Sequence, residues 1–171
     1  MRSGLDQAHY LFAIHAPLPG TNEFYALEVL NAYLADGMSS KIFLKVREER
    51  GLAYAVRGAI NAEKDYCYYS IYVGTKKEAI KEVEKIILEE FEKAKKMNAK
   101  ELKEAKERVI GLRKVGSEES SNVMSELVFN ELVGSAEDYY KYEENIKKVT
   151  LADIKKLANI KEYSSAAIVP K

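Results

Sequence analysis

The residues of this chain that could do chemistry together lie on either side of Gly51. Arg47 falls at the end of a short predicted helix, and Tyr54 falls at the start of the strand that follows. Guanidinium and phenol groups are both hydrogen-bond donors that can meet a carbonyl oxygen or an oxygen carrying negative charge. Taken by themselves, the two residues are read as a positive charge favourably placed against the helix dipole and an ordinary strand aromatic.

The histidines do not form a recognisable metal site. The chain has two, His9 and His15, and neither belongs to an H-x-x-E-H or H-E-x-x-H motif, the spacings that bring two imidazoles and a glutamate onto one helical face. In a strand the two rings would share a face but lie roughly 20 Å apart at ~3.3 Å per residue, too far to bind one ion. We therefore expect structural roles for both, or a contact with substrate or a partner, and no metal bound by this chain.

No other set of residues suggests a catalytic centre. Adjacent glutamates on a helix point in different directions, so a solvated helix surface is their expected role. Ser117, Ser120 and Ser121 have no histidine nearby in the sequence, and a triad would have to recruit one from a strand. A hydrolase that needs only this chain therefore lacks both a nucleophile and a base.

Length and charge limit the kinds of partner. At 171 residues and 47% hydrophobic content, the chain is long enough to form one domain, residues 1–171, that buries its own core. Lysine plus arginine equals aspartate plus glutamate at 27 each, so no net field favours nucleic acid or an anionic membrane. We expect neither nucleic acid nor a membrane as a partner.

The N-terminal region and the cysteine point to the cytoplasm. The apolar stretch Tyr10–Ala16 is too short for a membrane span, which needs roughly 20 residues, and His15 interrupts it. Cys67 is the one cysteine, so an internal disulfide is not possible and a reducing compartment is expected. Lysine and glutamate dominate the charged residues and Gln7 is the only glutamine, a bias typical of hyperthermophile proteins that hints at a thermophile source.

Alternating and helical hydrophobic patterns divide the chain into strands and helices. Thr75 with Glu78 is a predicted capping box, and Ser135 and Thr150 start two further helices in the same way. The predicted strands are Gln7–Ala16, Tyr54–Ala62, Tyr66–Val73 and Tyr163–Val169. The predicted helices run from Thr21 or Asn22 to near Gly37, from Ser39 or Ser40 to about Glu49, from Thr75 to about Lys96, from about Ala99 to Val115 and from Glu118 to Val133.

The two middle strands form a predicted hairpin with different faces. The loop 63–65 joins them and has the length and the polar residues of a hairpin turn. Because side chains alternate along a strand, one face of the second strand is apolar and the other carries phenols. The phenolic face holds Tyr66, Tyr68, Ser70 and Tyr72, and the apolar face holds Cys67, Tyr69, Ile71 and Val73. This order of elements predicts an α+β fold with a mainly antiparallel sheet.

The run Gly37–Val56 strongly resembles the second-half domain of the pitrilysin/insulinase family of zinc metallopeptidases, of the processing-peptidase type. The resemblance continues through Tyr66–Gly74, the helix that starts at Thr75 and the stretch Val149–Ile154, so it covers most of the chain. It implies the α/β-roll unit of the processing-peptidase/LuxS-like metallohydrolase type, with helices packed on one face of the sheet. Two such units would close like a clamshell, with their sheets lining a chamber.

The resemblance also implies roles for Arg47 and Tyr54. In that family the first half carries an inverted zinc motif, and the second half contributes an arginine and a tyrosine to the bound peptide. Arg47 and Tyr54 match that pair in type, spacing and flanking sequence. Tyr54 would then donate to the oxyanion in trans to the zinc half, and Arg47 would hold carbonyl groups of an extended substrate. The phenols of Tyr66, Tyr68 and Tyr72 either contact this peptide or simply form a half-exposed sheet face.

The function that the resemblance implies is that of the substrate-binding half of a zinc-dependent endopeptidase for short or unfolded peptides. The helix predicted over 22–35 contains no histidine, so zinc would be held only by a partner, the zinc-motif N-terminal half or a separate subunit, and this chain would be inactive alone. The alternative is a non-catalytic scaffold or interaction subunit of the same fold. A homo-oligomer is compatible with either function.

Overall fold

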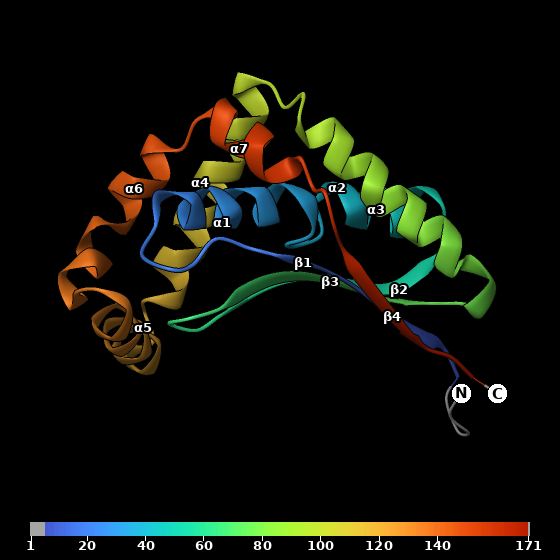
Figure 1. Cartoon of the computed structure of the whole chain (residues 1–171), viewed down its shortest axis with the longest axis horizontal. Helices are drawn as coiled ribbons and strands as arrows, with labels where there is room; N and C mark the ends of the chain where they lie inside the picture. The colour runs from blue at the N-terminus through green and yellow to red at the C-terminus, as the bar shows by residue number, and fades with distance from the viewer. Residues whose placement is uncertain (1–5, 171) are drawn as a thin grey trace.

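Four strands form one antiparallel sheet in the computed structural model, which describes residues 6–170. Their spatial order is β2-β3-β1-β4, so β1 lies inside the sheet and the last strand of the chain pairs with it. This pairing brings the two ends of the described chain to the same end of the molecule (Figure 1). The strands are β1 (Ala8–His15), β2 (Ala53–Ala62), β3 (Cys67–Thr75) and β4 (Ser164–Ile168).

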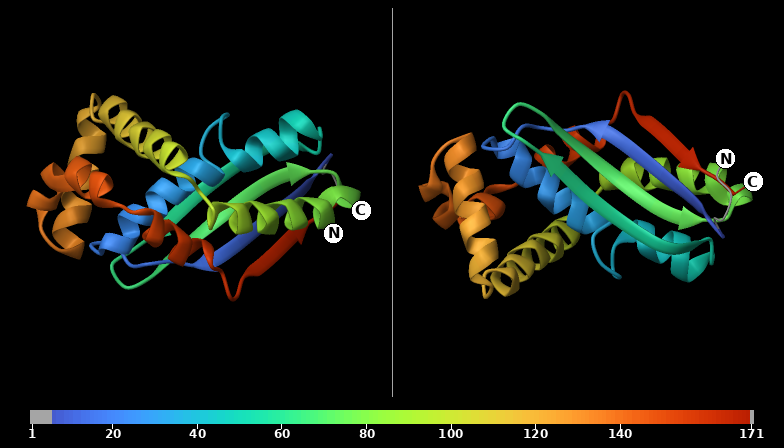
Figure 2. Two further views of the ribbon diagram at one scale, coloured as in Figure 1. Left: turned by 90° about the horizontal axis from the view of Figure 1, so that it is seen from above. Right: turned by 90° about the horizontal axis from the view of Figure 1, so that it is seen from below.

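The helices lie over one face of the sheet, and the opposite face has no helix over it (Figure 1 and Figure 2). The α-helices are α1 (Asn22–Leu34), α2 (Lys41–Phe43), α3 (Ile80–Ala94), α4 (Ala99–Gly116), α5 (Ser120–Val133), α6 (Tyr142–Lys148) and α7 (Leu151–Ala158). A π-helical turn, η1 (Leu44–Glu49), continues α2, and 3₁₀ turns η2 (Lys77–Ala79) and η3 (Ala136–Lys141) precede α3 and α6. The predicted α+β class, with helices on one face, is confirmed.

The core lies between the sheet and α1. Alternate residues of β1 and β3 point at the helices, and Phe12, Tyr69 and Ile71 are fully buried there. Leu27 and Leu30 of α1 meet them from the helix side with 1% and 0% exposure. The amphipathic patterns read from the sequence therefore pack against each other as two layers.

The strand register decides which side chains lie on the uncovered face of the sheet. Val73 pairs with both Tyr10 and Val56 on the helix side, so the residues between such pairs share the other side. We call this side the open face. It consists of His9, Leu11, Ala13 and His15 from β1, Ala55, Arg57, Ala59 and Asn61 from β2, Tyr68, Ser70, Tyr72 and Gly74 from β3, and Ser164, Ala166 and Ile168 from β4.

The predicted capping box of Thr75 with Glu78 is wrong. Thr75 is the last residue of β3, and its hydroxyl donates to the carbonyl of Leu52 in the approach to β2. The helix that follows starts with the 3₁₀ turn η2, whose N-cap residue is Lys76. Thr75 therefore belongs to the sheet. It pairs with residues of both neighbouring strands and its hydroxyl has a partly buried hydrogen bond, so the helix begins only after it.

Other helix starts fall where the sequence predicts them, with different partners. Thr21 and Ser40 are N-cap residues of α1 and α2, but their hydroxyls donate to the carbonyls of Leu18 and Gly37, each at 2.7 Å, and cap no helix N–H. The side chain and backbone of Thr150 do form the reciprocal capping box with Asp153.

Candidate functional site

The candidate site is the junction between η1 and β2, where the backbone makes two unusual turns in succession. The π-helical turn η1 contains Arg47, and π turns occur often at functional sites. Gly51 follows with φ of 60°, a left-handed conformation that glycine adopts without strain. The N–H of Leu52 donates to the carbonyl of Val46 at 2.8 Å, which ties the entry of β2 back to η1. The junction therefore holds its two ends together through backbone hydrogen bonds.

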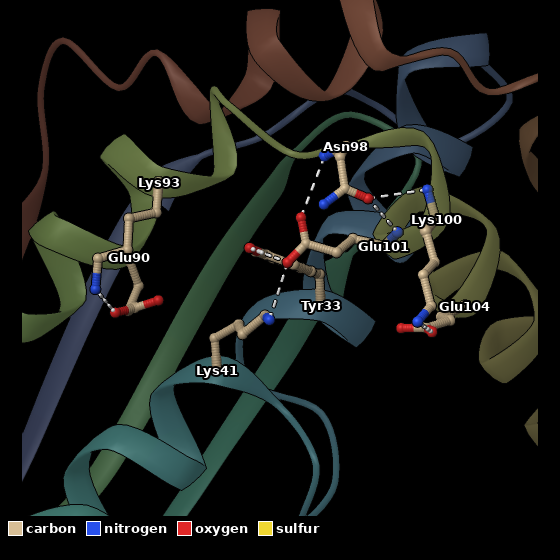
Figure 3. A network of polar contacts seen from close by, with 8 residues as sticks. All are labelled: Tyr33, Lys41, Glu90, Lys93, Asn98, Lys100, Glu101 and Glu104. Carbon is tan, nitrogen blue, oxygen red and sulfur yellow. Dashed lines mark hydrogen bonds and ion pairs between the residues drawn. The ribbon is translucent and has the colours of Figure 1, made fainter.

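A polar network fixes the helix that leads into this junction (Figure 3). Lys41, the first residue of α2, lies 3.0 Å from the carboxylate of Glu101 on α4, and the Tyr33 hydroxyl donates to the same carboxylate at 3.4 Å. Glu101 is itself held by the capping box of α4, in which the Asn98 side chain accepts from the N–H groups of Lys100 and Glu101. Three helices are thus joined at the base of the junction. The Asn-x-x-Glu spacing of Asn98 and Glu101 is a sequence signal for the start of α4, and the predicted start at about Ala99 does not rely on it.

Arg47 presents its guanidinium to solvent. Its side chain is 48% exposed, and its nearest acid is Glu48, 4.0 Å from Nε to Oε1. The guanidinium carbon lies 5.1 Å from the centre of the Phe43 ring, one turn earlier. This cation–π contact orients the side chain without using its hydrogen-bond donors. The donors therefore remain available to an incoming ligand.

Tyr54 occupies a β-bulge at the start of β2. Ala53 pairs with Thr75 and Ala55 pairs with Gly74, so Tyr54 is an extra residue with no partner of its own. Bulges often redirect a side chain at the edge of a sheet. The Tyr54 ring is 60% exposed, and within residues 6–170 its hydroxyl has no hydrogen-bond partner. Like Arg47, Tyr54 thus offers an unused donor.

The three remaining tyrosines predicted as substrate-binding residues lie in two places. Tyr72 is on the open face beside Gly74, near the bulge, whereas Tyr68 is at the hairpin end of β3. Four residue steps separate Tyr68 from Tyr72 along the strand, roughly 13 Å at ~3.3 Å per residue. Tyr66 precedes β3, so it has no place in the strand register, and it stacks on Tyr68 with 6.4 Å between ring centres. The predicted set therefore extends along the sheet and does not form one cluster.

Two further residues of the open face lie beside Tyr72: His9, for which the sequence leaves a contact with substrate or a partner open, and Arg57, which the predicted site does not include. The Nδ1 atom of His9 is 2.7 Å from the Tyr72 hydroxyl, and the two rings stack with 5.9 Å between centres. Arg57 lies directly opposite Tyr72 on β2 and is exposed. Only the register across strands reveals this group, because the three residues belong to three separate strands.

The described part of the chain offers no metal site. Within residues 6–170, no three side chains of the histidine, cysteine, aspartate or glutamate type gather closely enough to hold a metal ion. His9 uses Nδ1 for Tyr72, and Cys67 is free and buried. Nor is any helix in these residues long and apolar enough to cross a membrane.

Comparison with known proteins identifies the family of the chain. Residues 2–109 match the family model described as the peptidase M16 inactive domain. The chain is 30% identical over 171 residues to the uncharacterized zinc protease YmxG of Bacillus subtilis, an alignment that covers 96% of this chain and 42% of YmxG. The chain therefore spans about two fifths of the length of this relative.

Solved structures share the fold. A protease from Helicobacter pylori superimposes with a TM-score of 0.88 at 18% identity, over 99% of this chain and 42% of the protease. The inactive peptidase domain of a zinc protease from Bordetella parapertussis gives 0.84 at 15% identity, over 100% of this chain and 97% of that domain. This chain therefore shares the α/β-roll fold of these domains. The family model, at residues 2–109, covers more than half of the chain. This chain belongs to the M16, or pitrilysin/insulinase, peptidase family, as its second-half domain without the zinc motif.

Proposed function

We propose that this chain is the substrate-binding half of a zinc-dependent endopeptidase that cleaves short or unfolded peptides. The observation that carries the proposal is the junction at which Arg47 and Tyr54 are both exposed, with hydrogen-bond donors that no residue of the range 6–170 accepts from. The junction adjoins the open face, which no helix covers (Figure 2). An extended peptide on that face would end at these two donors.

The proposal assigns zinc to a partner. The relative YmxG is named a zinc protease and is more than twice as long as the aligned region, so the remainder of such a protein has room for a second unit. The residues described in this chain do not fit a zinc ion. The partner would be an N-terminal half of a longer chain or a separate subunit, and the cytoplasm is the compartment that suits a free Cys67.

Tyr54 would act on the reacting carbonyl. When water adds to a peptide bond, negative charge develops on the carbonyl oxygen, and a phenol O–H about 2.7–3.1 Å away stabilises that charge. The exposed position of the Tyr54 hydroxyl allows it to reach an oxygen presented by the opposing half. Removing one such donor typically costs ~10²–10³ in turnover.

Arg47 would hold the peptide in register. A guanidinium presents forked N–H donors and a permanent charge, and these can bind carbonyl oxygens of an extended backbone. The stacking of Arg47 on Phe43 restricts the side chain before a peptide arrives, which lowers the entropy lost on binding. Tyr72 and Tyr68 would contact the peptide farther along the open face, with Tyr66 beside Tyr68.

The test is cleavage of a short fluorogenic peptide in the presence of zinc. We would compare this chain, a family zinc-motif half from the same source, and the mixture. We expect turnover only in the mixture, and a loss of ~10²–10³ in kcat for Tyr54→Phe. The matched control is Tyr140→Phe on η3, where the ring is 77% exposed and distant from the junction.

The same assay separates the alternative, a non-catalytic scaffold. A scaffold would associate with the zinc half and would be indifferent to Tyr54→Phe. Association without cleavage, or equal activity of the Tyr54→Phe and Tyr140→Phe mixtures, would refute the proposed role of Tyr54. Cleavage by this chain alone would place the chemistry elsewhere.

A further inference from the structure

The open face differs in charge from the molecule as a whole. The complete chain balances 27 basic against 27 acidic residues. The register, however, places no aspartate or glutamate on the open face, while Arg57, His9 and His15 all lie there. The acidic residues of the strand region lie outside this face, as Glu63 and Asp65 do in the hairpin loop beyond β2. Within the described residues, the open face therefore carries the positive charge of Arg57 and no carboxylate.

Arg57 is the permanent charge of this face and is not neutralised within the described residues. It is exposed, and no carboxylate of residues 6–170 lies within 4.0 Å of it. Cations in the helix layer differ, since pairs such as Lys147 with Glu143, 2.7 Å apart, compensate each other. A guanidinium without a partner has donors and charge available for a ligand.

The relief of the open face suits an extended chain. Ala13 and Ala59 both pair with Ser70, and Ala55 pairs with Gly74, so small side chains face one another across neighbouring strands. Leu11 and Ile168 are exposed at 40% and 52% on the β1 and β4 side and offer apolar contact. Next to Arg57, the His9 and Tyr72 pair adds polar groups held by their own hydrogen bond. Such a surface can contact backbone and side chains of a peptide at once.

We propose that the open face selects extended peptides that carry acidic side chains, and that Arg57 is the residue that selects them. A carboxylate of the peptide would meet the two-pronged donor edge of Arg57. A peptide lysine at the same place would lie beside Arg57, with no carboxylate on the open face to pair with it. The positive charge of Arg57 would therefore repel it. This inference rests on the proposed function, because the peptides selected are taken to be the substrates of the peptidase.

Binding can be measured without cleavage. We would use fluorescence anisotropy with two labelled ten-residue peptides, identical except for two glutamates in one and two lysines in the other, on this chain alone. At low salt we expect the glutamate peptide to bind ~5–10-fold more tightly, the size expected for one or two exposed charge contacts. Added salt should reduce the ratio, because exposed charges are screened within about 10 Å at 0.1 M.

Variants assign the preference to its residue. Arg57→Gln should bring the binding ratio to within about twofold of unity, while Arg57→Lys, which keeps the charge but loses the two-pronged donor edge, should retain part of the preference. The control is Lys100→Gln, which removes the same charge from α4, where the side chain is 85% exposed and 3.9 Å from Glu104. We expect this control to leave the ratio unchanged, since α4 lies in the helix layer.

Equal binding of the two peptides, or equal loss of preference in Arg57→Gln and Lys100→Gln, would overturn the proposal. Cleavage of both peptides by the mixture with the zinc half provides the separate readout. If the glutamate peptide binds better but no peptide is cleaved, the proposed function fails and the selection stands. If both are cleaved but bind equally, the selection fails and the proposed function stands.

Discussion

Two polar regions of this protein are built in opposite ways. The junction carries Arg47 and Tyr54, 48% and 60% exposed, with donors that no neighbour uses. The second region, which we call the buried cluster, consists of Glu28, Arg113, Glu126 and Tyr142, which lie partly buried between four different helices. The first region is open to a ligand from outside the molecule, whereas the charged groups of the second face one another within the helix layer.

The buried cluster is centred on Arg113. Its guanidinium carbon lies 3.7 Å from the centre of the Tyr142 ring, and its Nη2 atom lies 2.5 Å from the Glu126 carboxylate. Burial of its carboxyl group raises the pKa of Glu28 to about 7, an effect that the Tyr142 hydroxyl and nearby Arg113 offset only in part. A cavity of ≈ 380 Å³ adjoins these residues. Desolvation and one shared cation thus set the chemistry of this region.

The comparison teaches that a strongly perturbed carboxyl group does not locate the site in this fold. Perturbed pKa values often mark active sites, but structural ion-pair networks shift them as well. Glu28 lies on α1, on the helix side of the sheet, whereas the open face and the junction lie on the other side and at its edge.

Arg113→Met should have the largest effect on stability. The substitution leaves the carboxylates of Glu28 and Glu126 without their cation and removes the contact with Tyr142. The expected loss is about 3 kcal/mol, at the low end for a buried pair because the Glu126 side chain is 40% exposed. Urea unfolding monitored by circular dichroism measures this loss. The control is Arg47→Met, for which we expect a change within about 0.5 kcal/mol.

Comparable losses of unfolding free energy in Arg113→Met and Arg47→Met would contradict the contrast between the two regions. That result would mean that Arg47 has a structural role at the junction. A loss of unfolding free energy in Arg113→Met with no loss in Arg47→Met would support the contrast. The same substitution would then distinguish a cation that stabilises the fold from one that is available to a ligand.

Glu28→Gln should stabilise the protein in a pH-dependent manner. The folded pKa of Glu28, about 7, lies above its ordinary value of 4.5. Between these values the folded protein holds a proton that the unfolded chain has released, so wild-type stability falls as pH rises through the window. Glutamine does not titrate. The variant should match wild type near pH 4 and gain up to about 3 kcal/mol above pH 7, as measured by urea unfolding at several pH values.

Glu23→Gln on the same helix is a control of opposite sign. Backbone hydrogen bonding at the start of α1, together with Lys156, lowers the pKa of Glu23. Its stabilising contribution is therefore present above its ordinary pKa and is lost as pH falls, so this variant should lose stability near neutral pH and not near pH 3. Parallel pH profiles for the Glu28→Gln and Glu23→Gln variants would contradict the assignment of a buried Glu28.

The sequence predicts the fold and the junction but not the buried cluster. Helix and strand periodicities locate the elements to within a few residues, because amphipathic faces must meet in one core. Arg47 and Tyr54 are singled out by the family resemblance, which their types, spacing and flanking residues carry within one short stretch of sequence. The roles of Arg47, Tyr54 and the three tyrosines, and the single-domain organisation, stay predictions.

Residues that meet only in space escape sequence reasoning. Arg57 and Tyr72 become neighbours through strand register, and Glu28 and Arg113 through helix packing. The bulge at Tyr54 is likewise absent from the sequence, since alternation predicts a regular strand from that residue onward. The Thr75 cap fails for a related reason, because a tertiary hydrogen bond to Leu52 outweighs a local motif.

Gly51→Ala should have the smallest effect, but it tests the junction directly. Gly51 has φ of 60°, and no atom lies within 4 Å of the position that an added methyl group would take, so alanine meets no clash and bears only the strain of the left-handed conformation. That strain costs about 1 kcal/mol. Gly111→Ala in α4 also meets no atom within 4 Å but lies in a helix, where alanine gains about 0.5–1 kcal/mol over glycine. Thermal unfolding should therefore shift downward for Gly51→Ala and upward for Gly111→Ala.

The opposite signs matter because the two substitutions add the same methyl group in open space. If Gly51→Ala proved neutral, the turn between η1 and β2 would not require its left-handed residue, and the fixed placement of Arg47 relative to Tyr54 would lose its backbone basis. If it destabilises as expected, the mixture with the zinc half should lose turnover beyond the loss of folded protein, because relaxing the turn moves Tyr54 relative to Arg47. The Gly111→Ala mixture should keep full turnover, since Gly111 lies on α4 well beyond Glu101, the residue through which that helix joins the network at the junction.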